Sequence, residues 1–357
     1  MPEMAHFDLE AYGLDDEPGS EQDLDARSVE PKVAPVEIIA PNAWYGHAAL
    51  LRAFAGIDPD RPVRVVVPHG VDYERRGNMM RSREALPVLV YSTEGADQPY
   101  QAAGARLVWR VPSPFALVKR LMANAPQARS GTVVFPSHSY VAPTANEPGP
   151  VTVCMDYVAL AERLLALPDH LQPVTVCLFY VDVLLGRQRP FVERGLRVVT
   201  AGHRLDSRFL IRLDRICRAH IHAAGTGVGS HVFYAVHAGC HFSHIKMDIT
   251  HDGMSAERLR EHAGPERFIL DALADRTTLE QREFVHPYIS ADALPTRLAL
   301  RQLLLAAERL DRFGVSYAPR SEGRRVVVTG PWAAARSPYR RARQCYDGLW
   351  PRLTRSA

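Results

Sequence analysis

Residues 196–240 read LRVVTAGHRLDSRFLIRLDRICRAHIHAAGTGVGSHVFYAVHAGC. A short β-branched run is followed by a polar loop, an amphipathic helical pattern, a second short apolar run and a glycine-rich turn that leads into another helix. Strands and helices that alternate in this way are typical of βαβ units, whose parallel strands are covered by helices. The stretch therefore predicts an α/β fold.

The same alternation extends in both directions along the chain. We expect strands at 36–40, 63–67, 87–93, 105–111, 132–135, 174–181, 196–200, 220–223 and 241–245, and helices at 47–54, 115–125, 207–218, 230–239 and 296–313. The sequence LPDHLQP (167–173) places prolines around polar residues, which favours a linker. We therefore predict two α/β units with parallel sheets, one on each side of this linker.

Composition excludes several classes of protein. The chain has 357 residues, of which 46% are hydrophobic and 23% are charged, so it is neither wholly disordered nor collagen-like. It has no uncharged apolar run long enough for a transmembrane helix, and its N-terminus lacks the basic start and apolar core of a signal peptide. Its five cysteines are scattered without a CxxC pair, so we expect reduced thiols and a cytoplasmic protein.

Charge is unevenly distributed along the chain. The first thirty residues carry ten acids and one base, a net charge of −9, whereas the whole chain is +3 and the remainder is therefore +12. We expect residues 1–33 to form a disordered acidic tail. The basic remainder suits an anionic ligand, although an arginine-rich solvated surface would give the same count.

The C-terminal segment, residues 316–357, is also basic. From Arg320 onward it contains nine arginines against Glu322 and Asp347. This composition is compatible with peripheral contact with membrane headgroups, or with a final helix laid across the two units. Its aromatic residues are not arranged as stacking platforms, so we do not expect nucleic acid as a partner.

The strongest candidate for ligand binding is the glycine-rich turn after the strand at 220–223. Glycines allow close approach of a ligand to the backbone, and a following helix N-terminus favours phosphate. The alternative is an ordinary glycine-rich turn in which Ser230 caps the helix. The candidate phosphate-binding residues are Gly225, Thr226, Gly227, Gly229, Ser230 and His231.

Several histidines follow strands and are candidates for proton transfer. His203 and Arg204 come directly after the strand at 196–200, where the arginine can pair with phosphate and the histidine can donate to it or transfer a proton. His47 opens the first helix, and His69 follows the strand at 63–67. Either can act as a general base toward a hydroxyl.

Two further groups carry weaker signals. His138 and Ser139 follow the strand at 132–135 and are candidates for a cleft position, but adjacent residues rarely form a nucleophilic pair and no GxSxG elbow is present. His237, His241 and His244 have plausible ligand spacings without an HExxH motif or a Cys/His quartet. We therefore expect no metal site.

Seven short motifs are spread over the chain: YGHA (45–48), PHG (68–70), FPSHS (135–139), VCLFYVDVLLG (176–186), TAGHRLDSRFL (200–210), GVGSHVFYAVHAG (227–239) and LEQREFV (279–285). Through these motifs the chain resembles a family of GT-B-type proteins from bacterial surface-polysaccharide gene clusters. The resemblance covers roughly residues 41–315 and is densest over 131–245. Sialyl- and Kdo-transferases of capsule synthesis are similar at a greater distance.

This resemblance implies two Rossmann-like domains facing across a cleft, followed by a helical C-terminal segment. Residues 34–168 would form an acceptor domain with His47 and His69, and residues 174–315 a donor domain. The implied activity is metal-independent transfer of a hexosyl or ulosonyl group, with a nucleotide sugar as co-substrate and no separate cofactor. The implied acceptor is a glycan or lipid-linked hydroxyl.

The resemblance also places the donor on particular residues. The donor nucleotide would meet residues 226, 227 and 229–231, with His203 and Arg204 nearby. The chain departs from the family pattern at Gly225-Thr226, where relatives tend to have Ser-Asn, and at Val181-Asp182, where they often have a glycine with a basic or aromatic residue.

The alternatives are a nucleotide-sugar epimerase or hydrolase on a similar fold, and a non-catalytic binding protein of polysaccharide assembly. Product formation from the donor alone would favour the epimerase or hydrolase.

Overall fold

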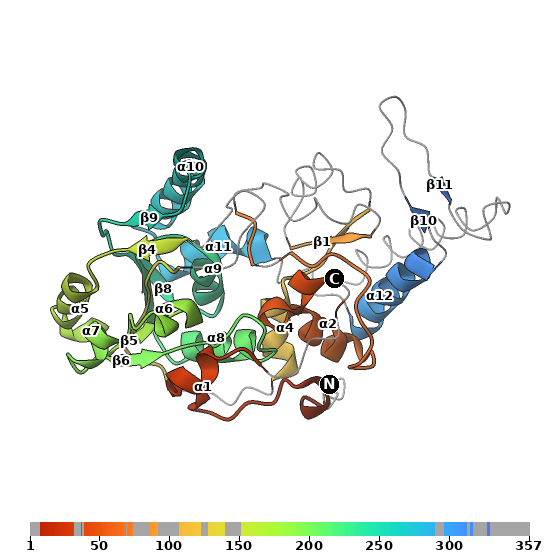
Figure 1. Ribbon diagram of the computed structural model, residues 1–357, viewed down its shortest axis with the longest axis horizontal. Helices are drawn as coiled ribbons and strands as arrows, with labels where there is room; N and C mark the ends of the chain where they lie inside the picture. The colour runs from red at the N-terminus through yellow and green to blue at the C-terminus, as the bar shows by residue number, and fades with distance from the viewer. Residues whose placement is uncertain are drawn as a thin grey trace. The chain divides into compact units, whose positions relative to one another are not determined.

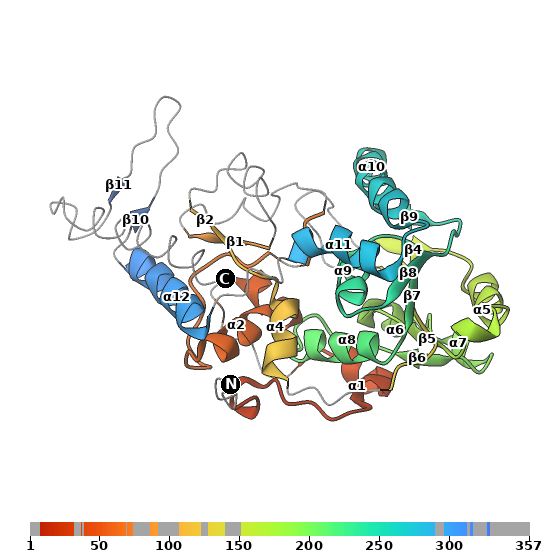
Figure 2. The same ribbon diagram turned by 180° about the vertical axis from the view of Figure 1, so that it is seen from behind.

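The computed structural model describes residues 8–31, 37, 39–68, 70–73, 86–91, 107–122, 128–139, 151–289, 296–312, 315–316 and 327–328. The chain is divided into two compact units (Figures 1 and 2). Unit 1 comprises Met1–Gly13, Pro35–Leu121 and Tyr288–Ala357, and unit 2 comprises Leu14–Ala34 and Met122–Pro287.

Unit 2 is built around a five-stranded sheet in the order β6-β5-β3-β7-β8, in which every strand pairing is parallel. Its strands are β3 (Thr132–Phe135), β5 (Val174–Cys177), β6 (Arg197–Val199), β7 (His222–Gly225) and β8 (His241–His244). The sequence prediction of an α/β fold with a parallel sheet is confirmed for this unit. The strand predicted at 132–135 has its predicted bounds, and the others are shorter or shifted by a few residues.

Helices cover both faces of this sheet, as a parallel sheet requires. Figures 1 and 2 show α5 and α7 on one face and α8 and α9 on the other. Their bounds are α5 Tyr157–Leu165, α6 Tyr180–Leu184, α7 Arg189–Val192, α8 Phe209–Arg218 and α9 Ser230–His237. A shorter ribbon pairs β4 (Thr152–Cys154) with β9 (Thr250–Asp252) in antiparallel fashion.

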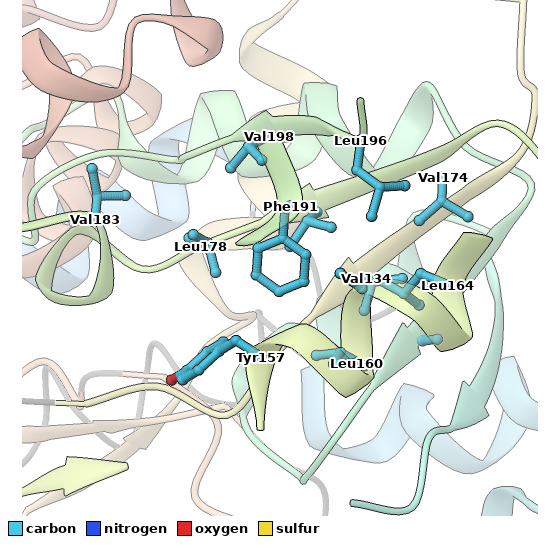
Figure 3. Packing of buried hydrophobic residues seen from close by; sticks show 13 residues of the cluster. Val134, Tyr157, Leu160, Leu164, Val174, Leu178, Val183, Phe191, Leu196 and Val198 are labelled. Atoms are coloured by element: carbon cyan, nitrogen blue, oxygen red, sulfur yellow. The ribbon is translucent and has the colours of Figure 1, made fainter. Parts of the chain in front are cut away.

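The core beneath α5 and α7 joins strands from both sides of the predicted linker. Phe191 of α7 is fully buried, and its ring meets that of Tyr157 edge-on at 6.2 Å (Figure 3). Around it lie Val134 of β3 and Val176 of β5. These apolar side chains are removed from water together, so β3 and β5 belong to one folding core.

The predicted domain limits, 34–168 and 174–315, are therefore wrong. Strand β3 lies in the middle of the unit 2 sheet, between β5 and β7, and unit 2 resumes at Met122. The proline-rich stretch 167–173 connects α5 to β5 inside unit 2 and contains the one-turn helix η5 (Asp169–Leu171). Helix α12 (Arg297–Arg312) belongs to unit 1, where it packs on α2 (His47–Ala55).

The acidic N-terminal segment is ordered from residue 8 to residue 31, so the prediction of a disordered tail over 1–33 is wrong for these residues. It contains η1 (Glu10–Tyr12), η2 (Ser20–Gln22) and α1 (Leu24–Ser28). Leu14 is fully buried, and the backbone oxygen of Glu21 accepts a hydrogen bond of 2.9 Å from Thr200 just beyond β6. Helix α1 packs on α6 of unit 2.

Charge complementarity explains why this segment is ordered. Arg215 of α8 donates from Nη1 to Asp16 at 3.0 Å and to Glu21 at 3.2 Å. The low apolar content of the segment predicts disorder only if the segment must fold alone. Its acids instead meet arginines of unit 2, and its backbone oxygens accept hydrogen bonds from Thr200 and His203, in the loop that follows the edge strand β6.

Unit 1 has a smaller parallel arrangement. Strands β1 (Val88–Val90) and β2 (Val108–Arg110) pair in parallel, and α4 (Pro114–Leu121) packs on α2. The run predicted as a strand at 63–67 contributes only a single bridge from Val66 to Val88. The strand predicted at 36–40 is not found at its described residues, because a 3₁₀ helix, η3, runs from Ala40 to Gly46.

The side chain of Asn42 explains why the run at 63–67 forms only one bridge to a neighbouring strand. Its fully buried side chain donates to the Val65 oxygen at 2.7 Å and accepts from the Val67 N–H at 2.9 Å, so it takes two backbone groups that a neighbouring strand would otherwise use.

The later part of the chain is helical and includes the helix predicted at 296–313. It contains α10 (Ala256–Leu273), α11 (Thr278–Ile289) and α12, followed by the short antiparallel pair β10 (Val315–Ser316) and β11 (Val327–Val328). The rest of the basic segment 316–357 lies outside the described residues. In the described part of the chain, no helix is both long enough and apolar enough to cross a bilayer.

Candidate functional site

The strand order of unit 2 defines one position for a ligand site. The chain runs from β3 outward to β5 and β6, then returns to the other side of β3 as β7 and continues to β8. In open parallel sheets, ligands bind beyond the carboxyl ends of the strands at the point where the order reverses. Here that point lies between β3 and β7, and we call the residues that follow these two strands the switch-point site.

Direct hydrogen bonds join the two strand ends. The Ser137 N–H donates to Thr226 Oγ1 at 2.8 Å, and the two hydroxyl oxygens are 3.1 Å apart. The Thr226 N–H in turn donates to the Phe135 oxygen at 3.3 Å. Thr226 is buried, and its hydrogen bonds hold the ends of β3 and β7 together. It therefore has a structural role, whether or not it also contacts a ligand.

The glycine-rich turn is close-packed. A Cβ on Gly225 would lie 3.4 Å from the Phe135 oxygen, and a Cβ on Gly227 would lie 2.7 Å from Ser137 Oγ and 2.9 Å from Glu266 Oε1. Larger residues would therefore not fit at Gly227 without displacing a neighbour. The alternative in which Ser230 caps the following helix is not found, because α9 begins at Ser230, its N-cap is Gly229, and no side chain caps it.

His231, predicted to bind the donor, is held neutral. Its ring lies 5.1 Å from that of Phe135. Burial, with a smaller contribution from the nearby His138, lowers the pKa of His231 to about 3. The imidazole therefore carries no positive charge at neutral pH and cannot pair with phosphate as a cation.

His138 is the exposed imidazole of the site. It follows β3, and its ring lies over that of Phe179 with centroids 4.5 Å apart. Its Nδ1 is 3.3 Å from the Ser139 oxygen. Because a carbonyl oxygen only accepts, this contact assigns the hydrogen of the neutral ring to Nδ1 and leaves the Nε2 lone pair for a proton or a ligand.

Ser139, predicted beside His138 as a cleft residue, is buried, and its N–H and Oγ both form hydrogen bonds within the protein. Its N–H donates to Asp182 Oδ2 at 3.1 Å, and its Oγ accepts from the Val153 N–H at 3.0 Å. Burial raises the pKa of Asp182, and the nearby His138 and Arg187 lower it in part. Asp182 thus places a carboxyl group near His138.

Two residues of the site were not found from the sequence. Glu266 of α10 accepts a hydrogen bond of 2.9 Å from the Val228 N–H. His251 of β9 is paired with Val153, whose N–H is bound to Ser139. Burial lowers the pKa of His251, while the charge of Glu266 raises it. Neither residue follows a strand of the main sheet, so the rule that located the other candidates could not reveal them.

His203 and Arg204 follow a different strand from the one that leads into the glycine-rich turn. They follow β6, and two strands lie between β6 and β7, which separates the strand ends by about 14 Å. The His203 N–H donates to the Arg27 oxygen at 2.7 Å, its Nδ1 accepts from Leu205, and its ring lies 4.2 Å from that of Tyr180. Burial lowers its pKa. The expected convergence with the turn is therefore not found.

The predicted bases of the first unit have different positions. His47 begins α2 and is completely buried, with its ring 5.9 Å from that of Tyr45 and 6.5 Å from that of Tyr91. A side chain with no exposure cannot take a proton from an acceptor without rearrangement. His69 lies outside the described residues.

The described residues include no group of three histidine, cysteine or acidic side chains arranged to hold a metal ion. Comparison with models of known protein families gives no match to this chain, and comparison with curated proteins gives no significant match.

Proposed function

We propose that the protein is a glycosyltransferase that binds a nucleotide-activated sugar at the switch-point site of unit 2. The observation that carries the proposal is the reversal of strand order between β3 and β7, with exposed His138 after one strand and the Thr226–Gly227 backbone after the other. Strand ends at such a reversal are the usual place for nucleotides in parallel α/β sheets. The GT-B-like sequence motifs and a chain with a net charge of +12 beyond its first thirty residues favour an anionic sugar donor.

His138 has the chemistry that the transfer requires. As the acceptor oxygen bonds to the anomeric carbon, the bond from that carbon to phosphate breaks, and its electron pair leaves with the nucleotide. The acceptor proton must go to a base. The Nε2 lone pair of His138 is suited to take it, and the carboxyl group of Asp182 nearby stabilises the imidazolium when it is ionised. The proposed acceptor is a glycan or lipid-linked hydroxyl.

Ligand-induced stabilisation tests the binding step. A ligand that binds only the folded protein must raise the unfolding temperature. UDP-, GDP-, dTDP- and CMP-linked sugars are titrated into the wild-type protein, into His138→Ala and into His170→Ala. His170 is exposed on η5, which precedes β5 and so lies toward the amino end of the sheet. We expect one nucleotide class to stabilise wild type and His170→Ala, and a weaker effect with His138→Ala.

Product analysis tests the transfer step. Sugar should move to an added acceptor in the wild-type reaction and not in that of His138→Ala. Conversion of the donor without acceptor would favour an epimerase or hydrolase instead. If none of the four nucleotide classes changes the unfolding temperature, the proposal fails.

A further inference from the structure

Glu266 places a carboxylate against the turn that was predicted to hold phosphate. The side chain comes from α10, far along the chain from β7, and its Oε1 accepts from the Val228 N–H at 2.9 Å. The same oxygen would be 2.9 Å from a Cβ on Gly227. The carboxylate therefore fills the space that the missing side chain of Gly227 leaves open.

The surroundings of Glu266 are polar. Ser137 Oγ would be 2.7 Å from the same Cβ on Gly227, and the charges of Glu266, His262 and His138 all act on His251. Among the described residues, none hydrogen-bonds to Glu266 Oε2, and the side chain is only partly buried. One carboxylate oxygen is thus fixed on the turn, while the other remains able to accept a hydrogen bond.

The charge of this carboxylate decides which ligand groups are compatible with the turn. A phosphate that reached the Val228 N–H would lie within a few ångströms of Glu266, where like charges repel strongly because the site is partly shielded from water. A sugar or ribose hydroxyl is instead attracted to this position, since it can donate a hydrogen bond to a carboxylate oxygen.

We propose that Glu266 is a specificity-determining residue, which makes the turn at residues 225–229 a subsite for the hydroxyl-bearing part of the ligand and excludes phosphate from it. The identity of that ligand rests on the function proposed above. The inference replaces the expectation that the turn binds the donor phosphates, and it assigns a task to a residue that lies outside the motifs of the sequence.

Two probes with opposite chemistry test this assignment. Inorganic pyrophosphate and the stabilising nucleotide sugar are titrated into wild type, Glu266→Ala and Glu266→Gln, and binding is followed at the backbone amides of residues 225–229 by NMR. Glu257→Gln is the matched control, because it removes the same charge from an exposed position on the same helix. Unchanged spectra elsewhere in the protein show that each variant is folded.

We expect pyrophosphate to shift these amides in both Glu266 variants with an affinity at least about tenfold above wild type, and Glu257→Gln to behave as wild type. The nucleotide sugar should bind Glu266→Ala more weakly than wild type. Equal pyrophosphate affinities in wild type and both Glu266 variants would overturn the inference. Tighter binding of both probes to Glu266→Ala would also overturn it, because Glu266 would then merely obstruct the turn.

The two proposals fail in distinguishable ways. If nucleotide sugars stabilise the wild-type protein but the Glu266 variants do not gain pyrophosphate binding, the proposed function stands and the role of Glu266 is wrong. If no nucleotide sugar binds while the variants gain pyrophosphate binding, the carboxylate does exclude phosphate and the glycosyltransferase proposal is wrong.

Discussion

Arg212 and Asp16 form an ion pair in the interior of unit 2, with Nε and Oδ1 3.0 Å apart and side chains 0% and 1% exposed. Arg212 also donates to Asp206 Oδ2 at 2.8 Å and to the Ala201 oxygen at 3.1 Å. A buried guanidinium is costly unless acceptors and opposite charge lie against it, and among the described residues Nε and Nη1 of Arg212 have acceptors whereas Nη2 has none. The N-terminal segment is therefore a structural part of unit 2, since it supplies one of these acceptors.

Asp16→Asn should destabilise the protein by roughly 3 kcal/mol, because it leaves part of the Arg212 charge without compensation in a buried position. Urea unfolding at neutral pH measures the change in free energy. The matched control is Asp15→Asn, which removes the same charge from an exposed neighbour and should change stability by less than about 0.5 kcal/mol. Equal effects of the two substitutions would mean that the ion pair has no structural role.

Hydrogen exchange should reveal the backbone hydrogen bonds between the N-terminal segment and the loop that follows β6. The Thr200 and His203 amides donate to the Glu21 and Arg27 oxygens at 2.9 and 2.7 Å, so we expect both to exchange slowly although neither lies in a helix or strand. In Asp16→Asn the two amides should lose protection together, because the segment that covers them opens as a unit. Fast exchange of both amides in the wild-type protein would contradict the ordered segment.

The elements that were predicted well are those with local signals. The strand over 132–135 is marked by a short continuous apolar run, and the helix over 296–313 by apolar residues at helical spacing. The sheet to which a buried parallel strand belongs is not a local property. The run TVVF of β3 is apolar on both faces and would suit either unit, so the predicted boundary at 168 could not be corrected from the sequence.

The sequence contains a feature that favours an ordered N-terminal segment, and this feature lies in α8. Arg212 stands among Leu210, Ile211, Leu213 and Ile216 of α8, on a helix whose apolar residues are buried. A charge in such a position requires a partner, and the acids of the N-terminal segment are an abundant source. Composition alone predicted disorder because it treats the segment without the arginine that it meets.

The candidate site was predictable only where its residues are marked by local features of the sequence. His138 and Thr226 follow β3 and β7, two strands that lie side by side in the sheet. The order of the strands, which separates His203 from Thr226, depends on long-range pairing. Glu266 reaches the turn from α10 through a contact 38 residues away along the chain, for which no spacing rule exists.

Gly202 lies in the loop over the buried arginine and has a φ of +103°. A Cβ there would lie 2.7 Å from Arg212 Nη1 and 3.3 Å from the Arg27 oxygen. Gly202→Ala should therefore combine backbone strain with a steric conflict and cost about 3 kcal/mol or more. The control is Gly195→Ala, which has a φ of +79° and no atom within 4 Å of the added Cβ, so that only the strain of about 1 kcal/mol applies. Thermal unfolding of both variants separates the two contributions, and equal shifts would show that the space around Gly202 adjusts freely.

His231 should make the protein sensitive to mild acid. Its pKa is lowered from 6.5 to about 3 by burial and by His138, so the unfolded chain binds a proton in a pH range where the folded protein does not. The stability contributed by the neutral ring is thus complete above pH 6.5 and is lost progressively as the pH falls toward 3. At pH 5 the loss of unfolding free energy relative to neutral pH is about 2 kcal/mol. His231→Gln has no such proton and should show a flatter dependence of unfolding free energy on pH between 7 and 5, whatever its stability at neutral pH. His170→Gln removes an exposed imidazole and should retain the wild-type slope. A wild-type slope in His231→Gln would show that its ring is solvated in the folded protein and that the switch-point site is more open than its packing indicates.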